Sequence, residues 1–449
     1  TCEAGPTPPL VVRAPNPRVP FPGDGAGLGC ARSGSPPEPV ERWGNGDLTH
    51  FRSRAPELGA VRPFDGVRGV GVWLVLLQHA WAISDSFSGY IDLFFVLSGF
   101  LITTLIFEEQ RSTGTVSLRN FYARRGIRLL PGLLVVLVVF WVPIALLARD
   151  LLGFVTLESL STLFYVHNIF FSPLLGSTQY MGQMWSLSLE EQFYLLGAVT
   201  TYLCLRRGWI RQLGVGLAAF ILFVWVSRAL GHGGPGQFWF QRPDAIALGV
   251  LLAIINAHLP TELSARARQR LSWAAWVAFP SFVFALFSSS KLVERLFGFY
   301  VPLYPTDIDI EIPENATREE FQELSNEAIQ QVLAQMPHGN YWARWGFTLA
   351  TASAAVLCIA FVRLRDDFAV SRWLSGRLLG YFGALSYALY IAHYQLFRLL
   401  DPDGNGGPKW IPVKLFAAFL FGAALHKWVE RPVARRLRPM FTPKVVAAR

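Results

Sequence analysis

The chain has 449 residues, of which 52% are hydrophobic and only 16% are charged, and its mean hydropathy is +0.34. Soluble domains carry about 25% charged residues, so this composition excludes an ordinary soluble protein and indicates one that crosses a membrane several times. The net charge of +9 comes from 40 basic residues, of which all but five are arginine. The four cysteines show no spacing typical of a metal site, and we expect no metal.

Residues 1–60 contain 11 prolines and nine glycines, with almost no apolar periodicity. Such a segment cannot bury enough apolar surface to offset its conformational entropy, so the sequence predicts a disordered tail and leaves open whether this tail is native. The membrane domain is expected at 61–440, and a basic cytoplasmic tail at 441–449.

Apolar runs that are long enough, or nearly so, to cross a bilayer recur from residue 67 onward, since about 20 residues span the hydrocarbon core. These runs cover about 67–84, 90–107, 129–148, 188–204, 211–230, 242–257, 271–288, 345–362, 378–399 and 411–429. The shorter stretch 157–172 contains Glu158, His167 and Asn168, and a polar segment exposed to lipid is costly. We therefore predict an all-α polytopic membrane protein with about ten transmembrane helices and one re-entrant or interfacial segment.

The positions of the basic residues test this topology. With ten crossings, the inner loops carry 21 Lys and Arg residues and the outer loops carry seven. This asymmetry follows the positive-inside rule and predicts that both termini are cytoplasmic. Counting 157–172 as a full crossing would place most of those arginines outside. The positive charge therefore marks a membrane face, and we expect the lipid bilayer, rather than nucleic acid, as a partner.

An acidic insertion at 289–344 is expected on the outer side, with nine acidic and four basic residues. Within it, Thr317 and Glu320 form a capping-box pattern ahead of apolar residues at helical spacing. We interpret the insertion as a solvated lid or spacer, with a substrate-binding role as the less favoured alternative.

The first span carries the clearest pair of candidate functional residues, because ionisable side chains inside a membrane are rare and costly. Arg68 and His79 are eleven residues apart, so both project from one helix face, about 16 Å apart along the axis. Histidine titrates near neutrality and suits general-base catalysis. Two alternatives stay open: Arg68 as a snorkelling anchor, and His79 as a hydrogen-bonded interior group.

Two further clusters carry charge. Glu190 and Glu191 head a hydrophobic span, and adjacent helical residues point about 100° apart, so at most one should face a given site. Arg124, Arg125 and Arg128 stand at a cytoplasmic helix entrance, where arginines can bind phosphate groups bidentately. On the residues alone, topology anchors or lipid-headgroup contacts are the preferred interpretation of these arginines.

Other polar or aromatic residues are weaker candidates with a supporting role: Asp65, Asp92, Ser98, Trp185, Arg242, Asp244 and His393. Each of Asp92, Arg242, Asp244 and His393 could instead belong to a satisfied intramembrane pair.

Taken together, these segments resemble the membrane-bound acyltransferase 3 family, which includes O-acyltransferases of bacterial surface glycans and macrolides. The stretches that carry the resemblance, in family order, are Asp65 to Gly69 with His79, Asp92 to Ile102, Arg124 to Arg128, Trp185 to Tyr194, Arg242 to Ala245, Ser386 to His393 and Glu430 to Pro432. The resemblance covers about 62–440, with a gap at the acidic insertion. Pro243, Ala392 and Tyr394 depart from the family pattern, which puts the identity of the acceptor in doubt more than the reaction class.

The resemblance implies an enzyme of the bacterial cytoplasmic (inner) membrane that moves an acyl group, usually acetyl, from cytoplasmic acyl-CoA to a hydroxyl of a glycan, glycolipid or macrolide. It implies His79 as the catalytic residue paired with Arg68. It also implies that Arg124, Arg125 and Arg128 contact the phosphates of the donor. Acyl-CoA is then a co-substrate, and no permanently bound cofactor is expected.

On this basis we expect the pantetheine arm of the donor to reach from Arg68 toward His79. The histidine would act as general base on the acceptor hydroxyl or transiently accept the acyl group, with Glu190 or Glu191 orienting the imidazole or the acceptor. Two rivals are a secondary transporter, since ten spans with buried charges also describe a carrier, and a non-enzymatic membrane scaffold. The sequence shows no inverted repeat, and the arginine cluster suits an anion as large as CoA, so the enzyme is favoured.

Overall fold

The apolar runs of the sequence fold as α-helices, because a backbone inside hydrocarbon must satisfy its own N–H and C=O groups. The computed structural model describes residues 53–80, 89–147, 149, 152–171, 180–230, 242–288, 342–401 and 407–442, with isolated residues between 297 and 327. Most of the predicted tail at 1–60, nearly all of the insertion at 289–344 and residues 443–449 lie outside the described residues.

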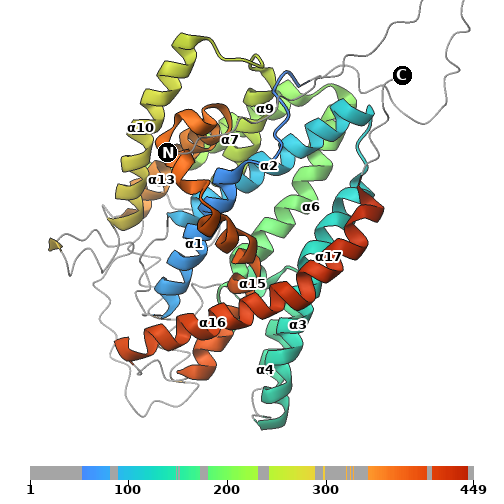
Figure 1. Cartoon of the computed structure of the whole chain (residues 1–449), viewed down its shortest axis with the longest axis vertical. Coiled ribbons are helices and arrows are strands. Elements are labelled where there is room, and N and C mark those ends of the chain that lie inside the picture. The colour runs from blue at the N-terminus through green and yellow to red at the C-terminus, as the bar shows by residue number, and fades with distance from the viewer. Residues whose placement is uncertain are drawn as a thin grey trace, which may run out of the picture. The chain divides into compact units, whose positions relative to one another are not determined.

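Helices follow one another along the described part of the chain, and no strand occurs in it (Figure 1). The longer helices are α1 (Arg62–Ala80), α2 (Tyr90–Thr113), α3 (Leu118–Leu147), α6 (Met184–Arg207), α7 (Ile210–Ala229), α9 (Pro243–His258), α10 (Ala265–Phe287), α13 (Trp342–Arg363), α15 (Arg377–Leu400) and α16 (Ile411–Leu425). The shorter elements are α4 (Leu152–Leu163), α5 (His167–Phe170), α14 (Ala369–Leu374), the π-helical turn η5 (His426–Glu430), α17 (Arg431–Leu437) and the 3₁₀ turns η3 (Arg365–Asp367), η4 (Pro408–Trp410) and η6 (Arg438–Phe441).

Six described helical stretches are long and apolar enough to cross a membrane. They are Tyr90–Thr113, Leu118–Pro143, Ile210–Ala229, Ala265–Phe287, Arg344–Arg363 and Pro408–Phe441. The other four predicted runs are also helical, in α1, α6, α9 and α15, but α9 is short and the remaining three carry several charged or polar residues. Ten crossings therefore stay a prediction, as does the cytoplasmic placement of both termini.

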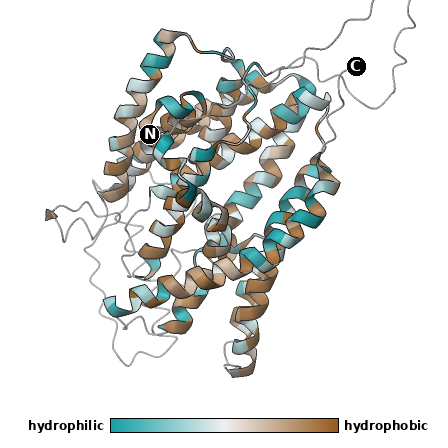
Figure 2. Ribbon diagram, viewed as in Figure 1, coloured by the Kyte–Doolittle hydropathy of each residue, from teal (hydrophilic) through white to brown (hydrophobic). Residues whose placement is uncertain are grey.

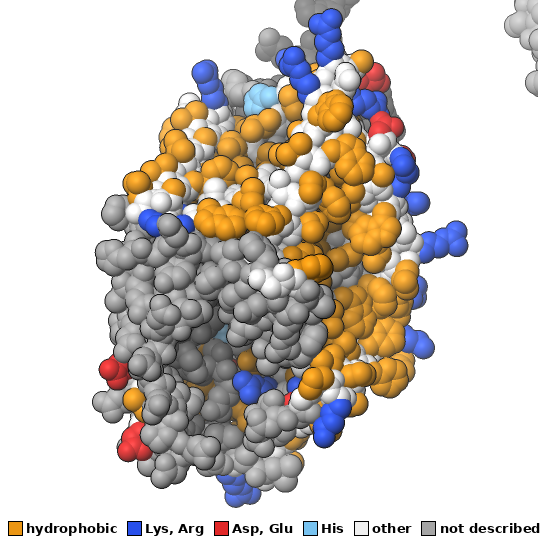
Figure 3. Space-filling model, turned by 90° about the vertical axis from the view of Figure 1, so that its left-hand side faces the viewer, with side chains coloured by type: hydrophobic (Ala, Val, Ile, Leu, Met, Phe, Trp, Pro, Cys, Tyr) orange, Lys and Arg blue, Asp and Glu red, His pale blue; other side chains and the backbone are white. Residues whose placement is uncertain are grey.

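The surface of the described helices is strongly apolar, as contact with lipid requires. Brown, hydrophobic ribbon runs along the lower part of α3 and through α4 in Figure 2. Hydrophobic side chains also cover much of the described part of the face in Figure 3. An integral membrane protein accounts for this distribution, since these apolar side chains would otherwise face water.

Glycines let two pairs of helices approach closely. A Cβ on Gly69 of α1 would collide with the backbone of α15, and one on Gly383 of α15 would collide with the backbone of α1. The same relation joins Gly99 of α2 to Gly249 of α9. Small residues at helix interfaces are the usual means of close packing in membranes. This packing fixes α1 against α15, the two helices that carry the candidate histidines.

Contacts between helix ends divide them into two groups. In one group, Arg124 at the start of α3 donates to the Phe441 carbonyl after α17 at 2.8 Å, and Arg363 at the end of α13 bonds to the end of α9. In the other group, Lys414 of α16 forms an ion pair with Asp401 at 2.8 Å. Each of these contacts joins helix ends that the predicted topology places on the same side of the membrane, and the topology itself stays a prediction.

One segment at the start of the predicted membrane domain packs against the helices. Residues 53–61, at the end of the predicted tail, include the buried Ala55 and Leu58, whose carbonyls accept hydrogen bonds from Arg111 and Arg365. Packed structure is therefore present before residue 61.

The stretch 157–172 forms the end of α4 and all of α5, and with 12 residues α4 is too short to cross a bilayer. Its polar residues Glu158 and His167 are buried inside the protein, and Glu158 accepts a hydrogen bond from the Met181 amide at 3.0 Å. Burial in protein removes the cost of exposing these groups to lipid. The re-entrant or interfacial assignment stays a prediction.

Candidate active site

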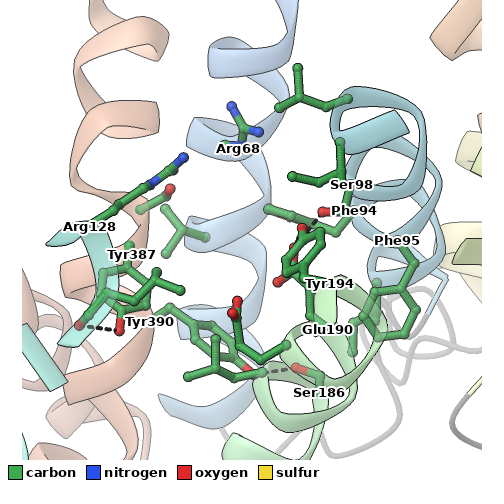
Figure 4. A pocket seen from close by; sticks show the side chains of 18 of the residues that line it. Arg68, Phe94, Phe95, Ser98, Arg128, Ser186, Glu190, Tyr194, Tyr387 and Tyr390 are labelled. Atoms are coloured by element: carbon green, nitrogen blue, oxygen red, sulfur yellow. Dashed lines mark hydrogen bonds between the residues drawn. The ribbon is translucent and has the colours of Figure 1, made fainter. Parts of the chain in front are cut away.

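A pocket with an empty volume of about 980 Å³ lies between α1, α2, α3, α6 and α15, and we call it the narrow pocket. Its polar lining residues are Arg68, Ser98, Arg125, Arg128, Ser186, Glu190, Glu191, Tyr194, Ser386, Tyr387 and Tyr390. In Figure 4, Arg68 and Arg128 lie toward one end of this pocket and Ser186 lies toward the other. All five helices contribute polar groups, so residues from the whole length of the chain converge there.

Glu190 presents its carboxylate in the narrow pocket with two hydroxyl groups directed at it. Ser98 Oγ donates to Glu190 Oε1 at 2.5 Å, and the Tyr194 hydroxyl donates to the same oxygen. Hydrogen bonds to a charged acceptor are stronger than neutral ones, so the carboxylate is held in one orientation.

Two tyrosines hold α15 against its neighbours. The Tyr390 hydroxyl donates to the Gln183 carbonyl at 2.5 Å, and its oxygen therefore accepts from Ser186 Oγ, 2.7 Å away. The Tyr387 hydroxyl donates to the Leu129 carbonyl of α3 at 2.8 Å. These bonds tie α15 to both α6 and α3, and so fix the helical turn that follows Tyr390.

Glu191 forms a bidentate ion pair with Arg125. Nη2 of Arg125 lies 2.6 Å from Oε1 of Glu191, and Nε lies 3.0 Å from Oε2. The guanidinium carbon is also 3.2 Å from the centre of the Tyr194 ring. The sequence predicted that at most one of the two adjacent glutamates faces a given site. Both line the narrow pocket, because Glu190 faces α2 and Glu191 faces α3.

A second pocket, which we call the wide pocket, has an empty volume of about 1880 Å³ and adjoins the first. The residues that line both are Leu101, Ile102, Arg125, Arg128 and Tyr387. The wide pocket brings the arginines of the 124–128 cluster together. Arg124 is engaged by Glu109 at 2.9 Å, whereas Arg128 is exposed at the junction of the pockets and has no carboxylate at ion-pair distance among the described residues.

One face of α1 leads from the narrow pocket to His79. Arg68, Val72 and Val75 line the pocket, and His79 follows Val75 by four residues on the same face. Four helical residues advance about 6 Å. The imidazole of His79 therefore lies about one turn beyond the pocket lining, to which it does not itself belong.

His79 has a second histidine as its partner. Its Nδ1 lies 2.9 Å from Nε2 of His393, and the two rings are nearly parallel with centroids 5.0 Å apart. Nδ1 of His393 is 2.7 Å from the Tyr390 carbonyl, and a carbonyl only accepts, so this nitrogen carries hydrogen. In the uncharged pair, His393 Nε2 accepts from His79 Nδ1–H, and His79 Nε2 keeps a lone pair. A lone pair held in this way is what a general base needs.

Two buried ion pairs lie near the starts of α2 and α9. Arg242 binds Asp92 at 2.9 Å, and Arg228 binds Asp244 through bonds of 2.7 and 2.9 Å. All four side chains are at most 4% exposed. Thr351 also donates to Asp92 at 3.1 Å. These charges satisfy one another and line neither pocket, so their geometry favours a structural role.

Two other predicted site residues, Asp65 and Trp185, lie outside the lining of both pockets. Asp65 is exposed and pairs with Arg68 at 3.2 Å. Trp185 is buried, with its ring 5.9 Å from the Arg242 guanidinium carbon and edge-on to Phe95. It therefore connects the start of α6 to the buried ion pairs.

The described contacts join His79 to His393 and not to Glu190 or Glu191, which bind the groups given above. Sequence reasoning did not single out four residues that complete the site, namely Ser186, Tyr194, Tyr387 and Tyr390. All four lie within the stretches that carried the family resemblance, which was the available signal. No group of three or more His, Cys, Asp or Glu side chains among the described residues is arranged to hold a metal ion.

Comparison with known families identifies the domain that contains this site. Residues 62–429 match the model of the acyltransferase 3 family, which is described as an acyltransferase domain. The chain belongs to this family. The matched domain thus contains the whole lining of the narrow pocket, both histidines, and those residues of the wide pocket that precede Glu430.

Individual relatives of this acyltransferase are O-acetyltransferases by name. "Putative peptidoglycan O-acetyltransferase YrhL" of Bacillus subtilis is 25% identical over 399 residues, which are 82% of this chain and 54% of that protein. "Peptidoglycan O-acetyltransferase OatA" of Listeria monocytogenes is 32% identical over 146 residues, which are 30% of this chain and 23% of that protein. The chain spans about half the length, or less, of these curated relatives. No solved structure matches it significantly.

Proposed function

We propose that this protein is an integral membrane O-acyltransferase that moves an acetyl group from cytoplasmic acetyl-CoA to a hydroxyl of a cell-surface glycan. The observation that carries the proposal is that the wide pocket adjoins the narrow pocket, and that one face of α1 leads from the narrow pocket to the His79–His393 pair. Membership of the acyltransferase 3 family supports acyl transfer, and the names of the relatives support O-acetyl transfer.

The two pockets match the two parts of a CoA donor. The wide pocket, with its arginines, suits the phosphates of the nucleotide, and Arg128, at the junction of the two pockets, has no carboxylate at ion-pair distance among the described residues. The narrow pocket suits the pantetheine arm, because most of its exposed lining surface is apolar and the hydroxyl groups of serines and tyrosines are interspersed in it. Arg68 and His79 are about 16 Å apart along α1, a distance of the order of that arm. The thioester then lies next to His79.

His79 acts as the general base. Its Nε2 takes the proton of the acceptor hydroxyl while the oxygen attacks the thioester carbonyl, and the C–S bond breaks as the ester forms. The imidazolium then returns the proton to the leaving thiolate, so the products are the O-acetyl ester and free CoA. His393 orients the imidazole through Nδ1, and Glu190 and Glu191 organise the pocket wall beside the thioester.

The acceptor is a hydroxyl of a cell-wall glycan, and peptidoglycan is the favoured candidate because the relatives carry that substrate in their names. The inner-loop arginines indicate that the wide pocket faces the cytoplasm. The acceptor then approaches His79 from the outer side. We propose that the protein lies in the bacterial cytoplasmic membrane.

The test uses the purified protein in nanodiscs with labelled acetyl-CoA and soluble glycan fragments of peptidoglycan. We expect thioester consumption and a glycan product that gains one acetyl group, with both lost in His79→Ala. Turnover of His79→Ala close to the wild type would contradict the assigned base. Uptake of a solute by proteoliposomes without any thioester consumption would favour a transporter instead.

A further inference from the structure

Three arginines that follow the last span line the wide pocket. Arg431 and Arg435 of α17 and Arg438 of η6 share one helix face, because they are spaced by four and three residues. All three side chains are exposed, and none forms an ion pair with another residue in the part of the chain that the structure describes. The pocket therefore presents three guanidinium groups that its own protein wall does not neutralise.

The arginines of α3 cannot supply the charge that a CoA nucleotide requires. Arg124 is engaged by Glu109 and by the Phe441 carbonyl, and Arg125 is engaged by Glu191. One phosphomonoester alone carries about −1.5 to −2 charges at pH 7, and a pyrophosphate adds to that. Arg128 by itself does not balance this charge, so further cations are needed in the same pocket.

The segment formed by α17 and η6 is held against α3. The bond from Arg124 to the Phe441 carbonyl, at 2.8 Å, fastens the end of η6 to the start of α3. The π-helical turn η5 precedes α17, and such turns are frequent at functional sites. Within η5, His426 pairs with the buried Glu430 at 2.8 Å, and both residues line the wide pocket. In Figure 1, α17 lies beside α3, with which it is in contact.

We propose that Arg431, Arg435 and Arg438, together with Arg128, bind the phosphate groups of the donor nucleotide, an adenosine 3′-phosphate 5′-diphosphate. This inference rests on the proposed function, which uses acyl-CoA as donor. Guanidinium groups bind phosphate bidentately, and the wide pocket offers one from α3, two from α17 and one from η6. An anionic lipid headgroup offers the same phosphate chemistry at a membrane surface, so the experiment must separate the two sources.

The test measures binding of adenosine 3′,5′-bisphosphate to the whole protein in nanodiscs of uncharged lipid, and the KM for acetyl-CoA. The variants are Arg431→Gln, Arg435→Gln and Arg438→Gln. The matched control is Arg436→Gln, because Arg436 is exposed on the same helix but does not line the pocket. We expect each of the three to raise the Kd and the KM about tenfold with kcat unchanged, since each removes a charge-assisted hydrogen bond. Arg436→Gln should stay within about twofold of the wild type by the same reasoning.

Equal Kd values for Arg435→Gln and Arg436→Gln would overturn the inference, and continued binding by the wild type would leave the proposed function standing. The wild type should also be measured in nanodiscs that contain phosphatidylglycerol. If it binds the bisphosphate in uncharged lipid but not in those nanodiscs, the site prefers a lipid headgroup, and the inference is overturned. A wild-type protein that neither binds the bisphosphate nor consumes acetyl-CoA would instead remove the proposed function. Thermal unfolding of each variant serves as the folding control, and Arg435→Lys should retain part of the affinity.

Discussion

Nδ1 of His79 lies 2.9 Å from Nε2 of His393, so two histidines 314 residues apart share a hydrogen bond. The Tyr390 carbonyl fixes hydrogen on the other nitrogen of His393, which leaves Nε2 of His79 as the basic atom. A histidine ordinarily needs a partner to select its tautomer, and here a second imidazole replaces the carboxylate that often does so.

Two substitutions of His393 distinguish its effect on the orientation of His79 from its contribution to packing. His393→Phe keeps the ring volume but removes the acceptor, and we expect kcat to fall by up to about 100-fold, the lower end of a general-base contribution. His393→Gln offers an amide oxygen to His79 Nδ1 and should recover part of that loss. The pH dependence of kcat should also shift in His393→Phe. Equal activity of the two variants would contradict an orienting role and indicate that only packing matters.

The ion pair between Arg125 and Glu191 should be coupled energetically. Both side chains are less than 20% exposed, at 17% and 11%, so removal of one partner leaves a poorly solvated charge. We expect Arg125→Gln or Glu191→Gln to cost about 3 kcal/mol each, and the double variant to cost clearly less than the sum. Unfolding in detergent measures the cycle. If the losses of unfolding free energy in the two single variants simply add in the double variant, the ion pair does not hold α3 to α6.

The buried pair of Asp92 and Arg242 should affect stability rather than substrate binding. Asp92→Asn leaves Arg242 buried without its counter-ion, and we expect a loss of about 3–5 kcal/mol in unfolding free energy. Thr351→Val removes one hydrogen bond to Asp92 and should cost about 1 kcal/mol. The KM for acetyl-CoA should be unchanged in both variants. A KM that rises severalfold in either one would place this pair in the donor site instead.

The sequence was sufficient to locate the helices, because apolar length and arginine placement are local signals. It also grouped Arg124, Arg125 and Arg128 correctly in space, since they occupy a single helix. It did not pair His79 with His393, because nothing in either segment specifies a contact across 314 residues. That contact depends on how closely α1 and α15 pack.

The two glutamates illustrate a second limit of the sequence. The 100° angle between neighbours on a helix predicts that at most one of the two glutamates faces a given site squarely. In the structure α6 lies between α2 and α3, so Glu190 and Glu191 both face the pocket from one helix. Periodicity gives direction around a helix axis but says nothing about how many partners surround that helix.

The ten-span topology predicts which ends of the helices face the cytoplasm. Lys409 near the start of α16 should be outside, and Ser112 and Arg436 should be inside, and all three are exposed. In a variant without its native cysteines, we expect Lys409→Cys to react with a membrane-impermeant maleimide on intact cells. Ser112→Cys and Arg436→Cys should react only after permeabilisation. Equal labelling of Lys409→Cys and Arg436→Cys on intact cells would contradict the topology.

Close packing of α1 on α15 should control activity through the histidine pair. A Cβ on Gly69 would collide with the Leu379 carbonyl and lie 3.1 Å from the Gly383 amide nitrogen, so Gly69→Ala must push the two helices apart. We expect a stability loss of about 1–3 kcal/mol and a fall in kcat. Gly380→Ala on α15 is the matched control, because no atom lies within 4 Å of its Cβ. A better helix former at that position should be neutral or stabilising by up to about 1 kcal/mol.

Comparison of kcat between these variants distinguishes a positional effect from general destabilisation. If Gly69→Ala lowers kcat at a temperature where it is fully folded, while Gly380→Ala does not, the separation of α1 from α15 is what reduces turnover. Addition of His393→Phe to Gly69→Ala should then cause little further loss, because both changes break the same hydrogen bond. Independent, multiplicative losses would instead show that Gly69 acts on a different part of the site, such as the placement of Arg68 in the narrow pocket.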